Sequence, residues 1–239
     1  MSADDITDGW TQPTHTFEKS AELHLKIQTI EGVDPLDAQF GIYTPKTVPD
    51  ALYEALFGQP EPTEDELAAS GDDPAKIPPM RTYAILDAAK ITNLPELLEA
   101  SPLEHRCLFK GNAYYALKDV APWVVRLEVG NSFTRNLFTR SSAPWHQWWD
   151  SEPGIYVRSR GTLDEIWAHF RRFTRVQDAD GKWYYFRFWE PKSVERMFSA
   201  FSHSEAQHFL APCFDLYTII LAPRVSCKRL FIEHSHFSV

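Results

Sequence analysis

The stretch from Arg172 to Pro191, RFTRVQDADGKWYYFRFWEP, has the pattern of a β-hairpin that is followed by the start of a helix. The turn lies at Asp178 to Gly181, and the residues on both sides of it are rich in β-branched and aromatic side chains. Alternation along residues 183–189 places apolar side chains on both faces. We therefore expect an interior strand, with Arg187 embedded among aromatic residues.

Arg187 has two interpretations. A guanidinium among aromatic rings requires a carboxylate partner, and Asp87 is a candidate because it ends another apolar run, Tyr83 to Leu86. Alternatively, Arg187 binds an anionic ligand. We favour the structural pairing.

Strand and helix patterns alternate along residues 81–239. Residues 83–86, 123–129, 214–221 and 225–232 read as strands. Helices are predicted from Leu94, from Leu163 with a capping box of Thr162 and Glu165, and from Pro191. This order predicts an α/β domain in which a mixed β-sheet is flanked by helices.

The first 80 residues differ in charge from the rest of the chain. They contain 16 acidic and 4 basic residues, a balance of −12, whereas residues 81–239 have a balance of +3. We expect a flexible arm over residues 1–20 and an acidic extension with linkers over residues 21–80. Within the extension we predict a strand over residues 21–30 and short helices over residues 49–57 and after Thr63.

Several functional classes lack their sequence signals. With 10 glycines the chain contains neither a Walker-type loop nor a dinucleotide-binding fingerprint, and no serine lies in a nucleophile elbow. No basic cluster predicts nucleic-acid binding, and no signal or membrane-spanning segment is visible, so we expect a cytoplasmic protein without a membrane partner. The three cysteines show no metal-like clustering and fit reduced, buried thiols.

Histidines and tryptophans form two further patterns. His203, Glu205 and His208 resemble a zinc-protease helix, but the two histidines are five residues apart rather than four, so we expect no metal and no cofactor. The three tryptophans at i, i+3 and i+4 form either an exposed face, which would bind a protein or a sugar, or part of the core, and we favour the core. These are Trp145, Trp148 and Trp149.

Residues 81 to about 213 resemble the bacterial domain of unknown function 4123. The similarity is carried, in order, by the motifs YAILDAA from Tyr83, LFKG from Leu108, APWVV from Ala121, HFRRFT from His169, the Asp180-Gly181 turn and FRFWEP from Phe186. The motif residues that we single out, and interpret as mostly structural, are Asp87, Pro122, Trp123, Arg171, Arg172, Arg187, Glu190 and Pro191.

The resemblance implies an α/β adaptor domain that binds a toxic effector and promotes its loading onto the type VI secretion spike, a valine-glycine-repeat protein. The expected partners are therefore a secreted effector and the spike protein, with no catalytic residue required. Two other classes stay open, an enzyme of hydrolase type with an active site outside known motifs and an immunity protein that neutralises a toxin. The oligomeric state is not determined by the sequence.

One motif position departs from the family pattern. Members of the family commonly have aspartate before the proline, where this chain has Glu190. If Pro191 is the first helical residue, position 190 is the N-cap, which aspartate caps well and glutamate poorly. The departure favours a capping role over a catalytic one.

Overall fold

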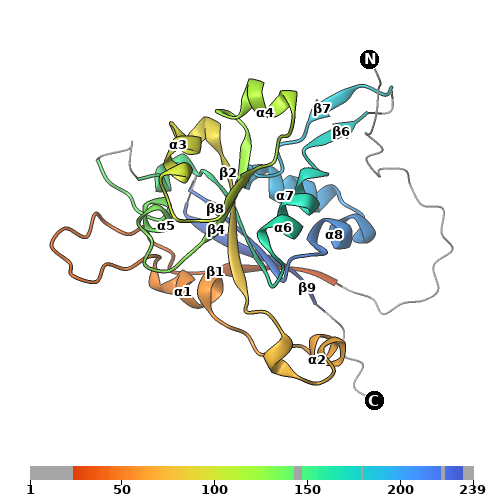
Figure 1. Ribbon diagram of the computed structural model, residues 1–239, viewed down its shortest axis with the longest axis horizontal. Coiled ribbons are helices and arrows are strands. Elements are labelled where there is room, and N and C mark those ends of the chain that lie inside the picture. Colours follow the sequence, from red (N-terminus) through yellow and green to blue (C-terminus); the bar gives the residue numbers. More distant parts are fainter. Residues whose placement is uncertain (1–23, 143–146, 179, 222–223, 234–239) are drawn as a thin grey trace.

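A seven-stranded antiparallel sheet forms the centre of the molecule (Figure 1). The computed structural model describes residues 24–142, 147–178, 180–221 and 224–233. The strand order is β1-β9-β8-β5-β2-β4-β3, and every pairing is antiparallel. The strands are β1 (His24–Ile30), β2 (Arg81–Asp87), β3 (His105–Cys107), β4 (Pro122–Leu127), β5 (Gly154–Ser159), β8 (Asp215–Ile220) and β9 (Ser226–Glu233).

Helices cover both faces of this sheet, which Figure 1 shows almost edge-on between them. One face carries α1 (Asp50–Phe57), α3 (Leu94–Glu99) and α5 (Ser132–Leu137), and the other carries α6 (Leu163–Arg171), α7 (Pro191–Ala200) and α8 (His203–Leu210). The predicted α/β architecture with a helix-flanked sheet is thus confirmed, but the sheet is antiparallel throughout and not mixed, because the order of strands and helices along the chain does not fix strand direction. The remaining helical segments are α2 (Glu64–Ser70), α4 (Asn112–Leu117), η1 (Pro74–Lys76), η2 (Ala88–Lys90) and η3 (Trp149–Ser151).

Alternation along the central strands supplies both cores. In β2, Tyr83 and Ile85 face the core under α6, α7 and α8, whereas Ala84 and Leu86 face the core under α1, α3 and α5. A strand that is buried on both faces has a continuous apolar run instead of alternating polar residues. None of the helices within the described ranges is long and apolar enough to cross a membrane.

The segment before residue 81 takes part in this sheet. β1 forms an edge of it and pairs with β9 near the other end of the chain, from His24 opposite Glu233 to Ile30 opposite Cys227. Leu52 and Leu56 of α1 are fully buried in the core that also contains α3 and α5. The predicted strand and helices of the acidic extension are present, and the strand and the first helix join the sheet and core built by later residues. The arm predicted over residues 1–20 lies outside the described residues.

Helix ends follow the predicted capping signals. Thr63 caps α2 and Thr162 caps α6, each in a reciprocal capping box with the glutamate three residues later. A third capping box, formed by Ser202 and Glu205, starts α8. Side-chain acceptors at these positions satisfy backbone N–H groups that have no partner inside the helix.

The hairpin around residue 180 is present, but the prediction that its second strand lies in the interior is wrong. β6 (Arg175–Gln177) and β7 (Trp183–Tyr185) pair only with each other and lie apart from the central sheet (Figure 1). Trp183, Tyr184 and Tyr185 are 42%, 45% and 55% exposed. The strand ends at Tyr185, and the chain then turns inward. Alternation within a strand cannot reveal whether another layer of the molecule covers it.

Candidate functional site

Arg187 and Asp87 form an ion pair between the return of the hairpin and the end of β2. The Nη2 atom of Arg187 lies 2.5 Å from Oδ2 of Asp87, whose side chain is 2% exposed, while that of Arg187 is 50% exposed. The other carboxylate oxygen, Oδ1, accepts a hydrogen bond from the Ala89 N–H at 3.0 Å and caps η2. Both oxygens of Asp87 therefore have donors, which is the arrangement that a buried carboxylate requires.

The Pro-Trp motif lies beside this pair. Pro122 starts β4 directly opposite Asp87, and its carbonyl accepts the N–H of Leu108 at 2.9 Å. Trp123 is buried, and its Nε1–H donates to the Lys118 carbonyl at 2.9 Å. These contacts join β2, β4 and the segment after β3, so we interpret the motif as structural.

The motif of α6 surrounds a buried histidine. His169 Nε2 donates to the Phe209 carbonyl at 2.9 Å, and Arg172 Nη2 donates to His169 Nδ1 at 3.0 Å. This pattern fits the neutral ring with its proton on Nε2. Burial lowers the pKa of His169 to about 4, and the positive charge of Arg172 contributes to the shift. Arg171, by contrast, projects over the ring of Trp167 on the surface.

Glu190 and Pro191 begin α7 as the sequence predicts. Pro191 is the first helical residue and is buried, and Glu190 occupies the N-cap position with extended backbone angles. The Glu190 side chain accepts no capping hydrogen bond from the backbone. Just before it, Phe188 and Trp189 are buried, and Phe188 stacks on Phe170 with ring centroids 5.5 Å apart.

Exposed aromatic side chains gather on the hairpin formed by residues 175–185, which we call the aromatic hairpin. Trp183, Tyr184 and Tyr185 are exposed on it, and Tyr185 contacts Phe109 with ring centroids 5.2 Å apart. Large exposed rings are enriched in protein–protein interfaces because each buries much apolar area while ordering few rotatable bonds. The aromatic hairpin is the candidate interaction surface.

Two of the three tryptophans that could have formed an exposed binding face lie in the core. Trp148 and Trp149 are each 3% exposed and pack in the core with α3 and α5, which was the favoured alternative. Trp149 begins η3, and Trp148 contacts Phe133 with ring centroids 5.2 Å apart. Trp145 lies outside the described residues. A buried pair cannot serve as an exposed binding face, so that candidate is withdrawn for Trp148 and Trp149.

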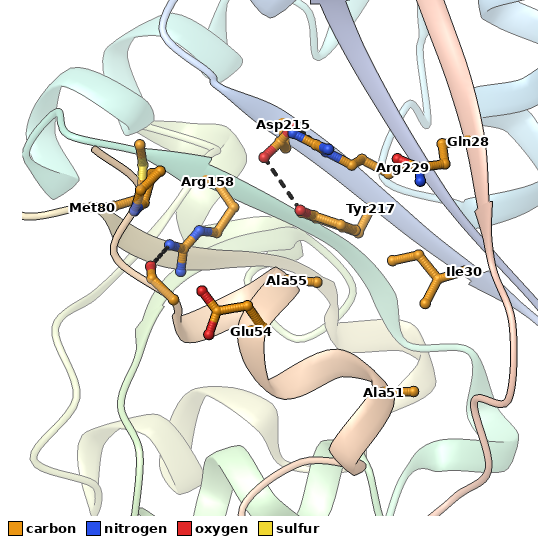
Figure 2. Close-up of a pocket in the computed structure, with 12 residues that line it drawn as sticks. Gln28, Ile30, Ala51, Glu54, Ala55, Met80, Arg158, Asp215, Tyr217 and Arg229 are labelled. Atoms are coloured by element: carbon orange, nitrogen blue, oxygen red, sulfur yellow. Dashed lines mark hydrogen bonds and ion pairs between the residues drawn. The ribbon is translucent and has the colours of Figure 1, made fainter. Parts of the chain in front are cut away.

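A polar pocket of about 380 Å³ lies between α1 and the strands β1, β5, β8 and β9 (Figure 2). Tyr217 donates to Oδ2 of Asp215 at 3.2 Å, and Arg229 Nε donates to Oδ1 of the same carboxylate at 2.6 Å. Burial raises the pKa of Tyr217 and lowers that of Arg158. Figure 2 shows Glu54 of α1 facing Arg158.

Hydrogen bonds of the pocket residue Arg158 and of Thr82 also connect α1 to the sheet. Arg158 Nη1 donates to the Thr82 hydroxyl at 2.8 Å, Nη2 donates to the Gly58 carbonyl, and the Thr82 hydroxyl donates to the Leu56 carbonyl. The carbonyls of Gly58 and Leu56 lie at the C-terminal end of α1, where a helix leaves backbone acceptors without partners. Because the Asp215 and Arg158 side chains are occupied by partners inside the protein, we interpret this pocket as a structural junction.

The structure describes some of the remaining candidates for chemistry. Glu205 forms the capping box of α8 with Ser202, and the described residues contain no group of three or more potential metal ligands. His234 and His236, two residues apart, would share a strand face and could hold a metal weakly, but they lie outside the described residues. No disulfide joins the cysteines, and burial raises the pKa of the Cys107 thiol to about 11 and that of Cys227 to about 12.

Sequence reasoning missed the cations beside the aromatic hairpin. Arg175 lies over the Trp183 ring at 4.9 Å, and Lys182 lies over the Tyr184 ring at 5.0 Å. The signal was present in residues 171–182, which contain four basic residues next to the aromatic run. It was overlooked because an interior strand would have left no exposed rings for these cations to cover.

Comparison with protein families identifies a family for this chain. A family model described as "Domain of unknown function (DUF4123)" matches residues 82–208, from the second residue of β2 into α8. No curated protein and no solved structure matches the chain. The matched region includes strands β2, β3, β4 and β5 and the aromatic hairpin, whereas β1, β8 and β9 lie outside it.

Proposed function

Since the chain belongs to the family of domain of unknown function 4123, we propose that it is an adaptor-chaperone that binds a toxic effector and promotes its loading onto the type VI secretion spike. The motif resemblance implies this role, and one structural observation supports it. Within the family region, three large aromatic side chains of the aromatic hairpin are exposed to solvent.

The local structure makes this exposure costly without a partner. Apolar rings gain free energy when they leave water, by roughly 25 cal/mol per Å² of apolar surface. The neighbouring rings of Phe188 and Trp189 are buried and gain this free energy. A chaperone that covers an effector before delivery needs such a surface on the outside of a stable domain, and the ion pair between Asp87 and Arg187 holds the base of the hairpin against the sheet.

Co-purification from the native host, followed by gene deletion, tests the proposal. An adaptor is expected to form a complex of equimolar ratio with an effector and to release it to the spike protein. Deletion of its gene should abolish delivery of that effector and leave the producing cell viable. Killing of the producing cell by its own toxin would indicate an immunity protein instead. Turnover of a substrate by the isolated chain, with no effector bound, would indicate an enzyme.

A matched pair of variants connects the test to the surface. Trp183→Ser with Tyr185→Ser removes two exposed rings of the aromatic hairpin, and Tyr53→Ser with Tyr115→Ser removes two exposed rings elsewhere. We expect effector binding to weaken only in the first pair. Equal binding by both pairs would separate the aromatic hairpin from the adaptor role.

A further inference from the structure

Contacts between cations and aromatic rings continue from the aromatic hairpin to α6, where the Trp167 ring is buried and only the cations over it are exposed; we call this set the cationic strip. Arg175 lies over Trp183 and pairs across the hairpin with Tyr185, which contacts Phe109. Lys110 follows Phe109 in the chain, and its Nζ atom lies 5.9 Å from the centroid of the Trp167 ring. The members of the cationic strip are Phe109, Lys110, Trp167, Arg171, Arg175, Trp183 and Tyr185.

The three cations of the strip have no acidic partner among the residues that the structure describes. Lys110, Arg171 and Arg175 contact aromatic rings only, at 5.9, 5.4 and 4.9 Å. A cation over a ring face is held in place by the ring quadrupole and keeps its charge available to a second ligand. These three charges are therefore both positioned and uncompensated.

Nearby acidic groups are largely engaged elsewhere. Asp164 pairs with Arg106, which itself covers the Trp167 ring at 3.6 Å. Asp178 accepts backbone N–H groups of the turn, at 3.0 Å from Asp180 and at 2.9 Å from Lys182. Asp180 is exposed at the tip of the hairpin. Residues 171–182 contain four basic and two acidic residues, so the strip is locally positive in a chain whose net charge is −9.

We propose that the cationic strip binds an acidic peptide segment of the effector that also carries apolar side chains. This inference rests on the proposed adaptor function and adds the chemistry of the partner. Carboxylates of such a segment would bridge Lys110, Arg171 and Arg175, and its apolar side chains would cover the exposed rings of Trp183 and Tyr185. Alternation of charge and ring along the strip selects for a segment with both properties.

Two synthetic peptides of twelve residues test this chemistry on the full chain. One alternates Asp or Glu with Phe or Trp, and the other has Asn or Gln in place of every acid. We expect the acidic peptide to bind at least about tenfold more tightly at low salt, measured by fluorescence anisotropy, and the difference to shrink in high salt as screening increases. Equal affinity of the two peptides would overturn the proposal.

Charge reversal locates the binding to the strip. Lys110→Glu with Arg175→Glu is expected to lower affinity for the acidic peptide by about tenfold or more. Arg196→Glu with Arg224→Glu, two exposed cations of α7 and of the loop between β8 and β9, is the matched control and should leave affinity unchanged. A loss that is equal in both variants would show that net charge alone attracts the peptide, and the strip would be excluded.

The effector complex distinguishes this inference from the proposed function. If an effector co-purifies and binds the Lys110→Glu, Arg175→Glu variant as tightly as the natural chain, the adaptor function stands and the strip is not its site. If the peptides discriminate as expected and no effector co-purifies, the adaptor function fails and the acidic-segment chemistry remains. If the acidic peptide binds only after Asp4, Asp5 and Asp8 are changed to Asn, the strip's occupant is this chain's own acidic segment, which overturns its assignment to the effector.

Discussion

The guanidinium of Arg187 forms an ion pair with the carboxylate of Asp87, which lies 100 residues earlier in the chain. One partner belongs to the return of the aromatic hairpin and the other to the end of a central strand. The pair therefore fixes where an outlying two-stranded ribbon leaves the domain. It is also the pairing that the sequence suggested, whereas the surroundings of Arg187 are more open than expected.

Removal of the guanidinium should destabilise the protein. Arg187→Met leaves a buried carboxylate without its cation, and we expect the free energy of unfolding to fall by about 1–3 kcal/mol, below the range for a fully buried pair because Arg187 is half exposed. Urea titration measures the change. In a double-mutant cycle with Asp87→Asn, additive effects would show that the pair contributes no coupling.

The N-cap of α7 offers a stabilising change. Glu190 makes no capping hydrogen bond, and its replacement by Asp should raise the free energy of unfolding by up to about 1 kcal/mol. Glu190→Ala, the control, loses only the long hydrogen bond of 3.5 Å that the Ser193 hydroxyl donates to Glu190, so it should have little effect. Thermal melting compares the three proteins, and a lower melting temperature for Glu190→Asp would contradict the capping account.

His169 should make stability depend on pH. Its pKa is lowered by burial from 6.5 to about 4, so the unfolded chain takes up the proton first as the pH falls. Stability from this group is fully present above pH 6.5 and decreases between pH 6.5 and about 4. We expect about 2 kcal/mol less stability at pH 5 than at pH 7 from this residue. The same pH dependence in His169→Gln, measured by urea unfolding, would refute the assignment.

Arg158 should hold the end of α1 against the sheet. In Arg158→Met the Gly58 carbonyl and the Thr82 hydroxyl lose their donor, and we expect a loss of about 2–3 kcal/mol of unfolding free energy. Hydrogen exchange of the α1 amides should accelerate more than that of the α6 amides. Arg196→Met, on an exposed face of α7, serves as the control. Uniform acceleration in both helices would mean that Arg158 has no local role.

Two aromatic residues five positions apart, Trp183 in the aromatic hairpin and Phe188 after it, should differ in their contribution to stability. Trp183 is exposed, so Trp183→Ser should change the free energy of unfolding by less than about 0.5 kcal/mol. Phe188 is fully buried, and Phe188→Ala should cost about 3–5 kcal/mol through the cavity that it leaves. Comparable losses in chemical denaturation would place both rings in the core and remove the candidate interaction surface.

Local signals in the sequence predicted most of the elements. The capping boxes at Thr63 and Thr162, the proline that starts α7 and the apolar run of β2 each act within a few residues, so their consequences appear without knowledge of the rest of the chain. The elements β3, α4, α5, α8 and the central strand β5 were not predicted, because three to eight residues carry too little periodicity to identify them.

The location of exposed and buried rings could not be predicted in the same way. Trp148, Trp149 and Trp183 all belong to aromatic-rich stretches, yet the first two lie in the core and the third is exposed. The difference in exposure arises because other segments of the chain cover Trp148 and Trp149 but leave Trp183 partly uncovered. The cations of the cationic strip became visible only when Lys110, Arg171 and Arg175 were brought to one surface.

The sequence by itself determined the alternation of strands and helices, the hairpin, the capped helix starts and the family motifs, since each depends on neighbouring residues. Tertiary structure alone decided the direction of the strands, the pairing of β1 with β9, the placing of α1 over the sheet and the exposure of the aromatic hairpin. These features depend on contacts between residues far apart in the chain. Their free energy comes from burial and pairing across the fold, which local patterns do not encode.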